Sequence, residues 1–147
     1  MKKVVLLALF LLLPHSAQAA ALYLSPSTIT LAPNQTGTFT VYVESSSQAM
    51  NAASGSISID GASVSGINKA GSIINFWAEE PTYSTNTISF EGVVLTPGYT
   101  GAAGKVLSFT VKAKTAGTYS ARFLSGSVLA NDGRGTDITS ATRGATI

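Results

Sequence analysis

Carboxylates are the side chains of this sequence that come nearest to a catalytic set. Glycoside hydrolysis needs two carboxyl groups that face each other across about 5 to 10 Å, usually deep in a cleft. Such a pair is available in principle from Glu79, Glu91 or Asp60, yet nothing in their spacing selects one pair. Glu80 directly follows Glu79, and a strand would point the two side chains in opposite directions. We interpret these residues as solvated charges and do not predict an enzyme.

The residues of other common catalytic sites are missing. The sequence has no cysteine, and its one histidine, His15, lies in an amino-terminal stretch that we expect to be removed. Ser-His-Asp and Cys-His catalysis are therefore excluded in the remaining chain, and so is a zinc site made of Cys or His ligands. The run Gly133-Arg134-Gly135 matches no phosphate-binding loop.

A glycine-rich turn at residues 132–137 suggests calcium binding at first sight. Asp132 and Asp137 bracket the turn, but the D-x-D-x-D-G spacing and the twelfth-position Glu of a calcium loop are absent. Two carboxylates are also few for an ion that takes about six to eight oxygen ligands. We predict a structural turn here, with no metal and no cofactor.

Three aromatic residues form a candidate platform for a polysaccharide, because a flat ring can stack on a sugar or anchor a protein partner. They are Trp77, which is the only tryptophan, and Tyr83 and Tyr99, which lie in expected loops. Tyr42 is an analogous outward ring on an early strand. Loop tyrosines are more often packing lids, so both interpretations stay open.

The orientation of Trp77 follows from the strand that is expected around it. Adjacent side chains on a strand point to opposite faces, so Phe76 and Trp77 cannot both be core. Alternation from Ile74 predicts that Phe76 turns inward and Trp77 outward with Asn75. A Trp77 covered by a neighbouring loop is an equal alternative, since Trp is often largely buried.

The amino end has the features of a secretory signal peptide. Lys2-Lys3 supplies a positive region, Val4 to Leu13 an apolar core, and Ala17-Gln18-Ala19 an A-x-A cleavage site. We predict that residues 1–19 are removed and that the chain meets a membrane only during export. An uncleaved anchor is the alternative, although Pro14 and the short apolar run argue against it.

Composition excludes a nucleic-acid partner and favours extracellular β-structure. Of nine Lys and Arg residues, Lys2 and Lys3 leave with the leader, so the remaining chain has seven positive and seven negative side chains. No basic footprint is left. Ser, Thr, Gly and Ala are abundant, as is usual in exported β-domains. Without disulfides, the domain depends on its hydrophobic core, and a chain of this size can bury about two-thirds of its unfolded surface.

Short alternating runs separated by Gly, Pro and Asn predict the strands that position these side chains. The clearest pair lies in residues 105–123, where Leu107, Phe109 and Val111 alternate with polar residues and Ala116-Gly117 separates a second run with Ala121. Loops are expected at 45–53 and 96–104, and a bulge at Gly92. The other predicted strands are 22–24, 28–31, 36–44, 54–60, 63–67, 73–78 and 87–95. We expect Glu79-Glu80-Pro81 to end the strand at 73–78. In the strand at 87–95 we expect Ile88, Phe90 and Val93 to point inward.

We predict an all-β fold, a two-sheet β-sandwich of about nine strands with jelly-roll topology. The domain is expected to span residues 20–140. Residues 141–147 are small and polar, and we expect a short carboxy-terminal tail there, either a last edge strand or a frayed end.

The order of several short segments resembles cohesin domains over nearly the whole expected domain, roughly Leu22 to Ile138. The segments that resemble the carboxy-terminal half are Thr87–Phe90, Pro97–Gly101, Gly104, Val111–Ala113 and Gly126–Gly133. Leu24-Ser25-Pro26 and Thr36–Val41 resemble the first strands. Cohesins are similar in fold to bacterial carbohydrate-binding modules and share with them a nine-stranded jelly-roll sandwich.

The resemblance implies a non-catalytic docking function. One sheet face of a cohesin receives a dockerin, a small helical calcium-binding module, and so gathers polysaccharide-degrading enzymes on a scaffold or cell surface. Any calcium would then belong to the partner, and the chain would be secreted or attached to the cell surface. One departure is the segment Gln48–Gly55, where cohesins often carry an acidic or large apolar residue and this chain has almost only small side chains.

Face alternation and the resemblance together predict the partner-binding residues, which are Ser56, Ser58, Ser89, Glu91, Thr96 and Tyr99. Two alternatives remain. The first is a carbohydrate-binding module that recognises a polysaccharide through Trp77, Tyr83 and Tyr99. The second is a plain structural domain of a cell-surface assembly.

Overall fold

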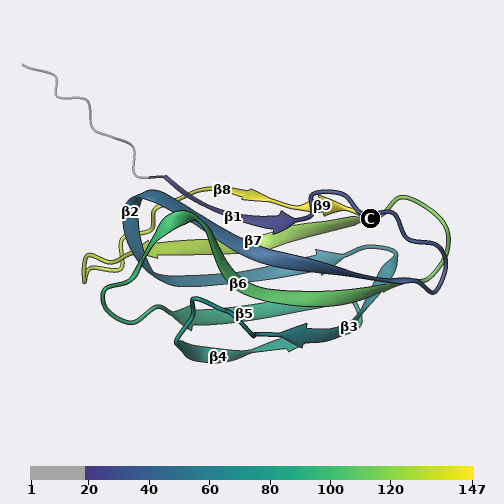
Figure 1. Cartoon of the computed structure of the whole chain (residues 1–147), viewed down its shortest axis with the longest axis horizontal. Helices are drawn as coiled ribbons and strands as arrows, with labels where there is room; N and C mark the ends of the chain where they lie inside the picture. The colour runs from purple at the N-terminus through teal and green to yellow at the C-terminus, as the bar shows by residue number, and fades with distance from the viewer. Residues whose placement is uncertain (1–18) are drawn as a thin grey trace, which may run out of the picture.

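The computed structural model describes residues 19–147. The secondary structure of this range consists of β-strands, with no helix (Figure 1). The expected signal peptide, apart from its last residue, lies outside the described residues. The strands are β1 (Ala20–Ser25), β2 (Thr36–Ile59), β3 (Ala62–Asn68), β4 (Phe76–Tyr83), β5 (Thr87–Val93), β6 (Tyr99–Ala113), β7 (Ser120–Ala130), β8 (Thr139–Arg143) and β9 (Ala145–Thr146). In the part of the chain that is described, no helix is long and apolar enough to cross a membrane.

The strands form two layers that share β2. One layer has the order β3-β6-β2-β1-β8, and the other has the order β4-β5-β2-β7-β9. The amino-terminal half of β2 pairs with β1 and β6, and its carboxy-terminal half pairs with β5 and β7. This arrangement confirms the predicted all-β sandwich.

The long strand β2 corrects the expected loop at residues 45–53. The backbone stays in strand pairing from Thr36 to Ile59 and turns back on itself at one end of the molecule (Figure 1). At this corner Ser45 is fully buried, and its hydroxyl donates a hydrogen bond of 2.7 Å to the carbonyl oxygen of Gln48. A strand that bends in this way passes from one sheet to the other without leaving the ladder. The small, polar side chains of residues 45–53 are typical of a loop, so the sequence predicted one. Pairing with distant strands cannot be recognised from polarity or size.

The core lies between the two layers and is made of the inward positions of the alternating strands. Phe39 on β2 and Phe109 on β6 are buried, with ring centroids 5.7 Å apart. Leu107 and Val111 point inward beside Phe109, as the alternation predicts. Each such side chain contributes about 1.5 to 3 kcal/mol through burial, so this interior can stabilise the domain without disulfides.

The strands β6 and β7 do not form the pair that the sequence suggests. β6 pairs with β2 and β3, whereas β7 pairs with β2 and β9, so the two lie in different layers. β6 also begins at Tyr99 instead of following a loop that lasts until Gly104. Of the predicted strand at 28–31, only a single bridge between Thr28 and Thr146 is present.

Residues 141–147 belong to the sandwich. β8 pairs in parallel with β1, β9 pairs with β7, and Ile147 is only 5% exposed. Tyr119 and Ile147 exchange two backbone hydrogen bonds of 2.7 and 2.8 Å. Of the two alternatives for this segment, the edge strand agrees with the structure and the frayed end does not, because β8 and β9 each add a strand to one layer.

Candidate functional site

The outer surface of the β4-β5-β2-β7 layer is the candidate site, and we call it the four-strand face. Ile57, Ile88 and Val128 point from this layer into the core and are fully buried. Their neighbours along each strand therefore point outward. Strand register brings these outward side chains into rows that cross the strands, and each row has its own chemistry.

The first row is apolar. It consists of Phe76, Val93, Ala52 and Leu129, which are paired in this order across the four strands. Phe76 is 58% exposed, and Leu95, two residues beyond Val93, is 57% exposed. Ala52, Val93 and Leu129 are only partly exposed, so the apolar contact surface that this row offers is centred on Phe76.

The second row is acidic and lies directly beside the first. It consists of Glu79, Glu91, Ser54 and Ser127. The hydroxyl of Ser127 donates a hydrogen bond of 3.1 Å to Asp137, which adds a third carboxylate to the end of the row. Between residues 19 and 147, no Lys or Arg forms a salt bridge with Glu79 or Glu91. Two like charges thus stand opposite each other across β4 and β5 without compensation.

The remaining rows are rich in hydroxyl groups. The third row consists of Thr82, Ser89, Ser56 and Ser125, and the fourth of Thr87, Ser58 and Arg122. Arg122 is held by Asp60, with 2.9 Å between its guanidinium Nη2 and the carboxylate oxygen. Beside the third row, a bulge in β7 leaves Leu124 66% exposed. The face therefore changes from apolar to acidic to neutral polar along the strands.

A small, shallow hollow of about 50 Å³ lies between the first two rows. It opens over Ala52 and Ser54 of β2, and Val93 and Leu129 stand on its two sides. Glu91, Ser127 and the backbone of Ala53 and Gly92 complete it.

Four of the six predicted partner-binding residues lie together on the four-strand face: Ser56, Ser58, Ser89 and Glu91. Thr96 is exposed in the turn after β5. Tyr99 begins β6 in the other layer, where its ring lies close to Gly101 and Gly104 and its hydroxyl accepts a hydrogen bond of 3.1 Å from the amide of Ala103.

The residues that the sequence analysis missed are Phe76, Glu79, Ala52, Val93 and Leu129. Their importance comes from strand register, which places them side by side although they come from four separate strands. Alternation within one strand gives no signal for this.

Phe76 does not turn inward and Trp77 does not turn outward as the alternation from Ile74 predicted, whereas the alternative of a covered Trp77 agrees with the structure. Trp77 is partly buried against the core, with the ammonium group of Lys69 5.8 Å from its ring centre, whereas Phe76 is exposed. The cause is the start of β4 at Phe76, because Ile74 lies in an irregular segment and its phase does not continue into the strand.

Gly92 explains how the indole of Trp77 fits under β5. A Cβ atom at Gly92 would lie 3.0 Å from Trp77 and 2.4 Å from Ile74. The pairing of β5 with β2 runs through this position without a shift, so Gly92 makes room and does not mark the predicted bulge. The predicted inward position of Val93 is wrong. Val94 is buried in line with Ile88 and Phe90, and Val93 points outward and is partly exposed.

The edge strand β4 also continues through Pro81 to Tyr83, past the predicted end at Glu79-Glu80-Pro81. β4 pairs only with β5, and an edge strand tolerates proline because one side of its backbone needs no ladder partner. Two register shifts, after Trp77 and after Glu79, accommodate the irregular residues.

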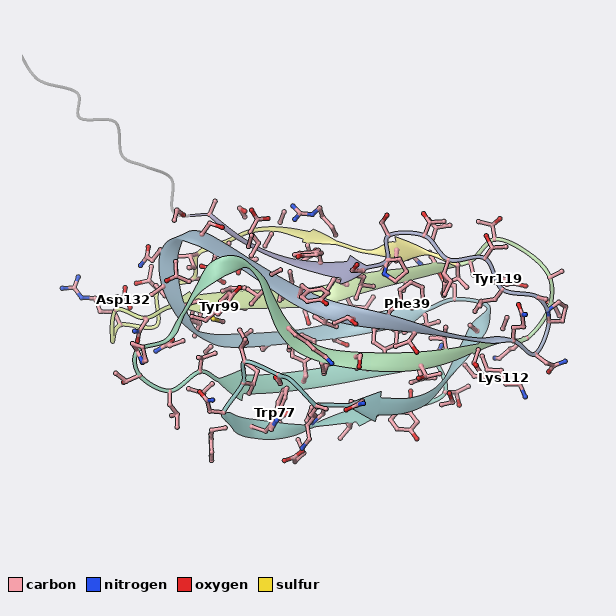
Figure 2. All side chains as sticks on the ribbon, in the orientation of Figure 1. Phe39, Trp77, Tyr99, Lys112, Tyr119 and Asp132 are labelled. Carbon is pink, nitrogen blue, oxygen red and sulfur yellow. The ribbon has the colours of Figure 1, made fainter. Side chains whose placement is uncertain are left out.

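The three rings of the candidate carbohydrate platform do not share a surface. Trp77 points inward from β4, Tyr83 is 49% exposed at the far end of β4, and Tyr99 lies in the other layer. Trp77 and Tyr99 are well separated in Figure 2. One face of the Tyr42 ring is covered, because it stacks on Tyr23 with 5.5 Å between centroids.

The turn at residues 132–137 is closed by its own hydrogen bonds. The Asp132 carboxylate accepts bonds from the amide of Arg134, at 2.9 Å, and from the hydroxyl of Thr136. These bonds lower the pKa of Asp132, with the hydroxyl of Thr136 as the largest cause. Asp132 lies at the tip of the molecule (Figure 2), and within residues 19–147 no group of three potential ligands is placed to hold a metal ion.

Comparison with known proteins gives a structural match only. No protein-family model and no curated protein sequence matches the chain. The fold is similar to that of the cohesin CaCohA2 from Clostridium acetobutylicum, with a TM-score of 0.68 and 17% identity over 86% of this chain and 89% of the other. The sandwich topology is thus the predicted jelly roll.

Two further solved structures share this fold. A type III cohesin from the cell-surface anchoring scaffoldin ScaE of Ruminococcus flavefaciens has a TM-score of 0.67 and 14% identity, covering 87% of this chain and 86% of the other. The third ScaB cohesin of R. flavefaciens, in complex with a group 1 dockerin, has a TM-score of 0.61 and 17% identity, covering 90% and 96%.

Proposed function

We propose that this chain, which has the fold of cohesin modules, is a non-catalytic binding module that docks a dockerin-type protein through its four-strand face. The observation that carries the proposal is the side-by-side placement of two rows. In the apolar row Phe76 is exposed, and in the acidic row no Lys or Arg of residues 19–147 forms a salt bridge with Glu79 or Glu91. Protein interfaces combine buried apolar anchors with a polar surround in this way.

The opposite sheet is a weaker candidate because its most aromatic part is already occupied. The ring of Tyr23 is stacked on Tyr42 on one side, and the guanidinium of Arg143 lies 5.4 Å from its centre. Arg143 in turn pairs with Glu44 at 3.2 Å. Burial raises the pKa of Tyr23, and neighbouring Tyr42 adds to the effect. Tyr23, Arg143 and Glu44 therefore already contact one another within the domain. On the four-strand face, Glu79 and Glu91 form no salt bridge with a Lys or Arg of the described residues.

The arrangement of the carboxylates supports a function without catalysis. Glu79 and Glu91 project side by side from one sheet surface, so they do not face each other across a bound sugar. Asp60, the third candidate, is paired with Arg122 at the other end of the face.

We further propose that the module is exported and acts in an extracellular polysaccharide-degrading or cell-surface assembly. Support comes from the signal-peptide features of residues 1–19 and from the match to a cohesin of a cell-surface anchoring scaffoldin.

The direct test is calorimetric titration of residues 20–147 against the dockerin modules encoded by the same genome. Calcium is present in one series and chelated in the other, since the calcium belongs to the dockerin. A parallel pull-down uses insoluble cellulose and chitin. We expect tight binding to at least one dockerin, loss of that binding on chelation, and no retention on either polysaccharide.

The opposite result would replace docking by sugar recognition. Retention on a polysaccharide, abolished by Trp77→Ala, together with no binding to any dockerin would support the carbohydrate-binding alternative. Absence of binding in both assays would leave a structural role in a cell-surface assembly.

A further inference from the structure

The hollow in the four-strand face exists because the outward side chains of the central strand β2 are short and those of the two neighbouring strands are longer. Ala52 and Ser54 on β2 have short side chains, whereas Val93 on β5 and Leu129 on β7 rise on either side. The run of small residues at 48–55, which is the departure from the cohesin pattern, supplies this floor.

The walls of the hollow have two kinds of chemistry. At one end Val93, Leu129 and Ala52 offer apolar contact, and at the other end Glu91, Ser54 and Ser127 offer oxygen atoms. Glu79 stands opposite Glu91 on the next strand, and Asp137 accepts a hydrogen bond from Ser127. A side chain that fills the hollow therefore needs an aliphatic stem and a positively charged, multiply donating head.

We propose that this hollow is a socket for one arginine side chain of the docking partner. The inference rests on the proposed function in that it concerns the same face, and it names the partner chemistry that this face selects. The stem would lie against Val93 and Leu129, and the guanidinium would lie over Ser54 and beside Glu91. Arginine is among the residues most often found as the central anchor of an interface.

An arginine fits this surface better than a lysine or a purely apolar residue. The guanidinium has five N–H donors in a planar fork, which can serve two carboxylates and a hydroxyl at once, whereas an ammonium group is a point charge. An apolar side chain would leave Glu91 desolvated beside it without a partner, which is costly. A cation between Glu79 and Glu91 would also relieve their mutual repulsion.

The test does not require the natural partner. Residues 20–147 hold all the strands and the core of the part of the chain that the structure describes. This domain is labelled with ¹⁵N and titrated with N-acetyl-arginine amide while its amide resonances are followed by NMR. N-acetyl-lysine amide compares the two cations. N-acetyl-citrulline amide has the shape of arginine without its charge.

We expect saturable shifts at the amides of Ser54, Glu91 and Ser127, with citrulline binding about tenfold more weakly because its hydrogen bonds lack charge. Glu91→Gln should weaken arginine binding about fivefold or more, and Ala52→Leu, which fills the hollow, should abolish it. Glu80→Gln is the matched control. Glu80 is bonded to Lys69 and lies outside the rows, so this variant should bind as the wild type does.

Equal binding of citrulline and arginine, shifts spread over the whole surface, or no shifts would overturn the socket. The dockerin titrations report separately on the proposed function. A dockerin that binds equally well to wild type and to Ala52→Leu leaves docking intact and removes the socket. Specific arginine binding without binding to any dockerin would support the arginine socket and contradict the proposed docking function.

Discussion

Glu79 and Glu91 lie directly opposite each other on β4 and β5, and both side chains are exposed on the same surface. Like charges at such positions destabilise a sheet, and no Lys or Arg among the described residues forms a salt bridge with either. The free domain thus carries a repulsion that a basic partner would remove.

Neutralising one member of this pair should have opposite effects on stability and on binding. Glu79→Gln is expected to raise the free energy of unfolding by about 0.2 to 1 kcal/mol, because it removes the cross-strand repulsion. The same change should weaken the dockerin complex about tenfold, because it removes a charged contact. Urea denaturation and calorimetric titration measure the two effects.

The control is Glu80→Gln, which removes the exposed ion pair with Lys69 and should give no gain in stability and no change in affinity. The stability gain of Glu79→Gln should also shrink at high ionic strength. A stability loss in Glu79→Gln at low salt would contradict the interpretation.

Two phenylalanines should separate folding from docking. Phe39 is fully buried against Phe109, so Phe39→Ala is expected to cost about 3 to 5 kcal/mol of stability. Phe76 is 58% exposed, so Phe76→Ala should change stability by less than about 0.5 kcal/mol. As the largest apolar side chain of the first row, Phe76 is expected to contribute at least about tenfold to dockerin affinity.

Denaturant titration and calorimetry of both variants check this separation. An unchanged affinity in Phe76→Ala would show that the first row lies outside the interface. A stability loss comparable to that of Phe39→Ala would show that Phe76 packs in the core.

Alternation within single strands made much of this fold predictable. Leu107, Phe109 and Val111 point inward as their spacing indicates, and so do Phe39 and Ile88. These predictions succeed because a side-chain period of two is a property of the local backbone. The same alternation places Ser56, Ser58, Ser89 and Glu91 on one outward face.

Register between strands was not predictable, and with it most of the candidate site. The row of Phe76, Val93, Ala52 and Leu129 depends on how four strands slide against one another, and bulges in β4 and β7 change that alignment. The inverted orientations of Phe76 and Trp77 have a related cause, since the irregular residues before β4 reset the alternation. The continuation of β2 through residues 45–53 was not predicted, because these small polar residues have the composition of a loop.

Gly92 should be intolerant of any side chain. A Cβ atom there would approach Ile74 to 2.4 Å and Trp77 to 3.0 Å, so Gly92→Ala is expected to cost about 1 to 3 kcal/mol through overpacking. The emission of Trp77, the only tryptophan, should change because the indole is displaced. Gly66→Ala is the matched control, since nothing lies within 4 Å of its added Cβ atom. Equal midpoints of denaturation for the two variants would contradict the packing of Trp77 under β5.

Asp137 should make stability depend on pH in the acidic range. Its carboxylate accepts hydrogen bonds from the amide of Thr139, at 2.8 Å, and from the hydroxyl of Ser127, at 3.1 Å. The bonds from Thr139 are the main cause that lowers its pKa in the folded state. The charged form is thus favoured by folding, and the resulting stability is present above the unfolded pKa of about 3.9 and lost as pH falls through the lower folded value.

Asp137→Asn should therefore be less stable than the wild type near neutral pH, by less than about 1 kcal/mol because the carboxylate is exposed and screened. The difference should narrow as the pH falls below about 4, where the wild-type carboxylate takes up a proton. Ser127→Ala keeps the carboxylate and removes one of its donors, so it should lose part of this stability. Thermal unfolding between about pH 2 and 7 measures all three proteins, and a difference that stays constant down to about pH 2 would contradict this assignment, because a protonated Asp137 no longer has the charge that strengthens these bonds.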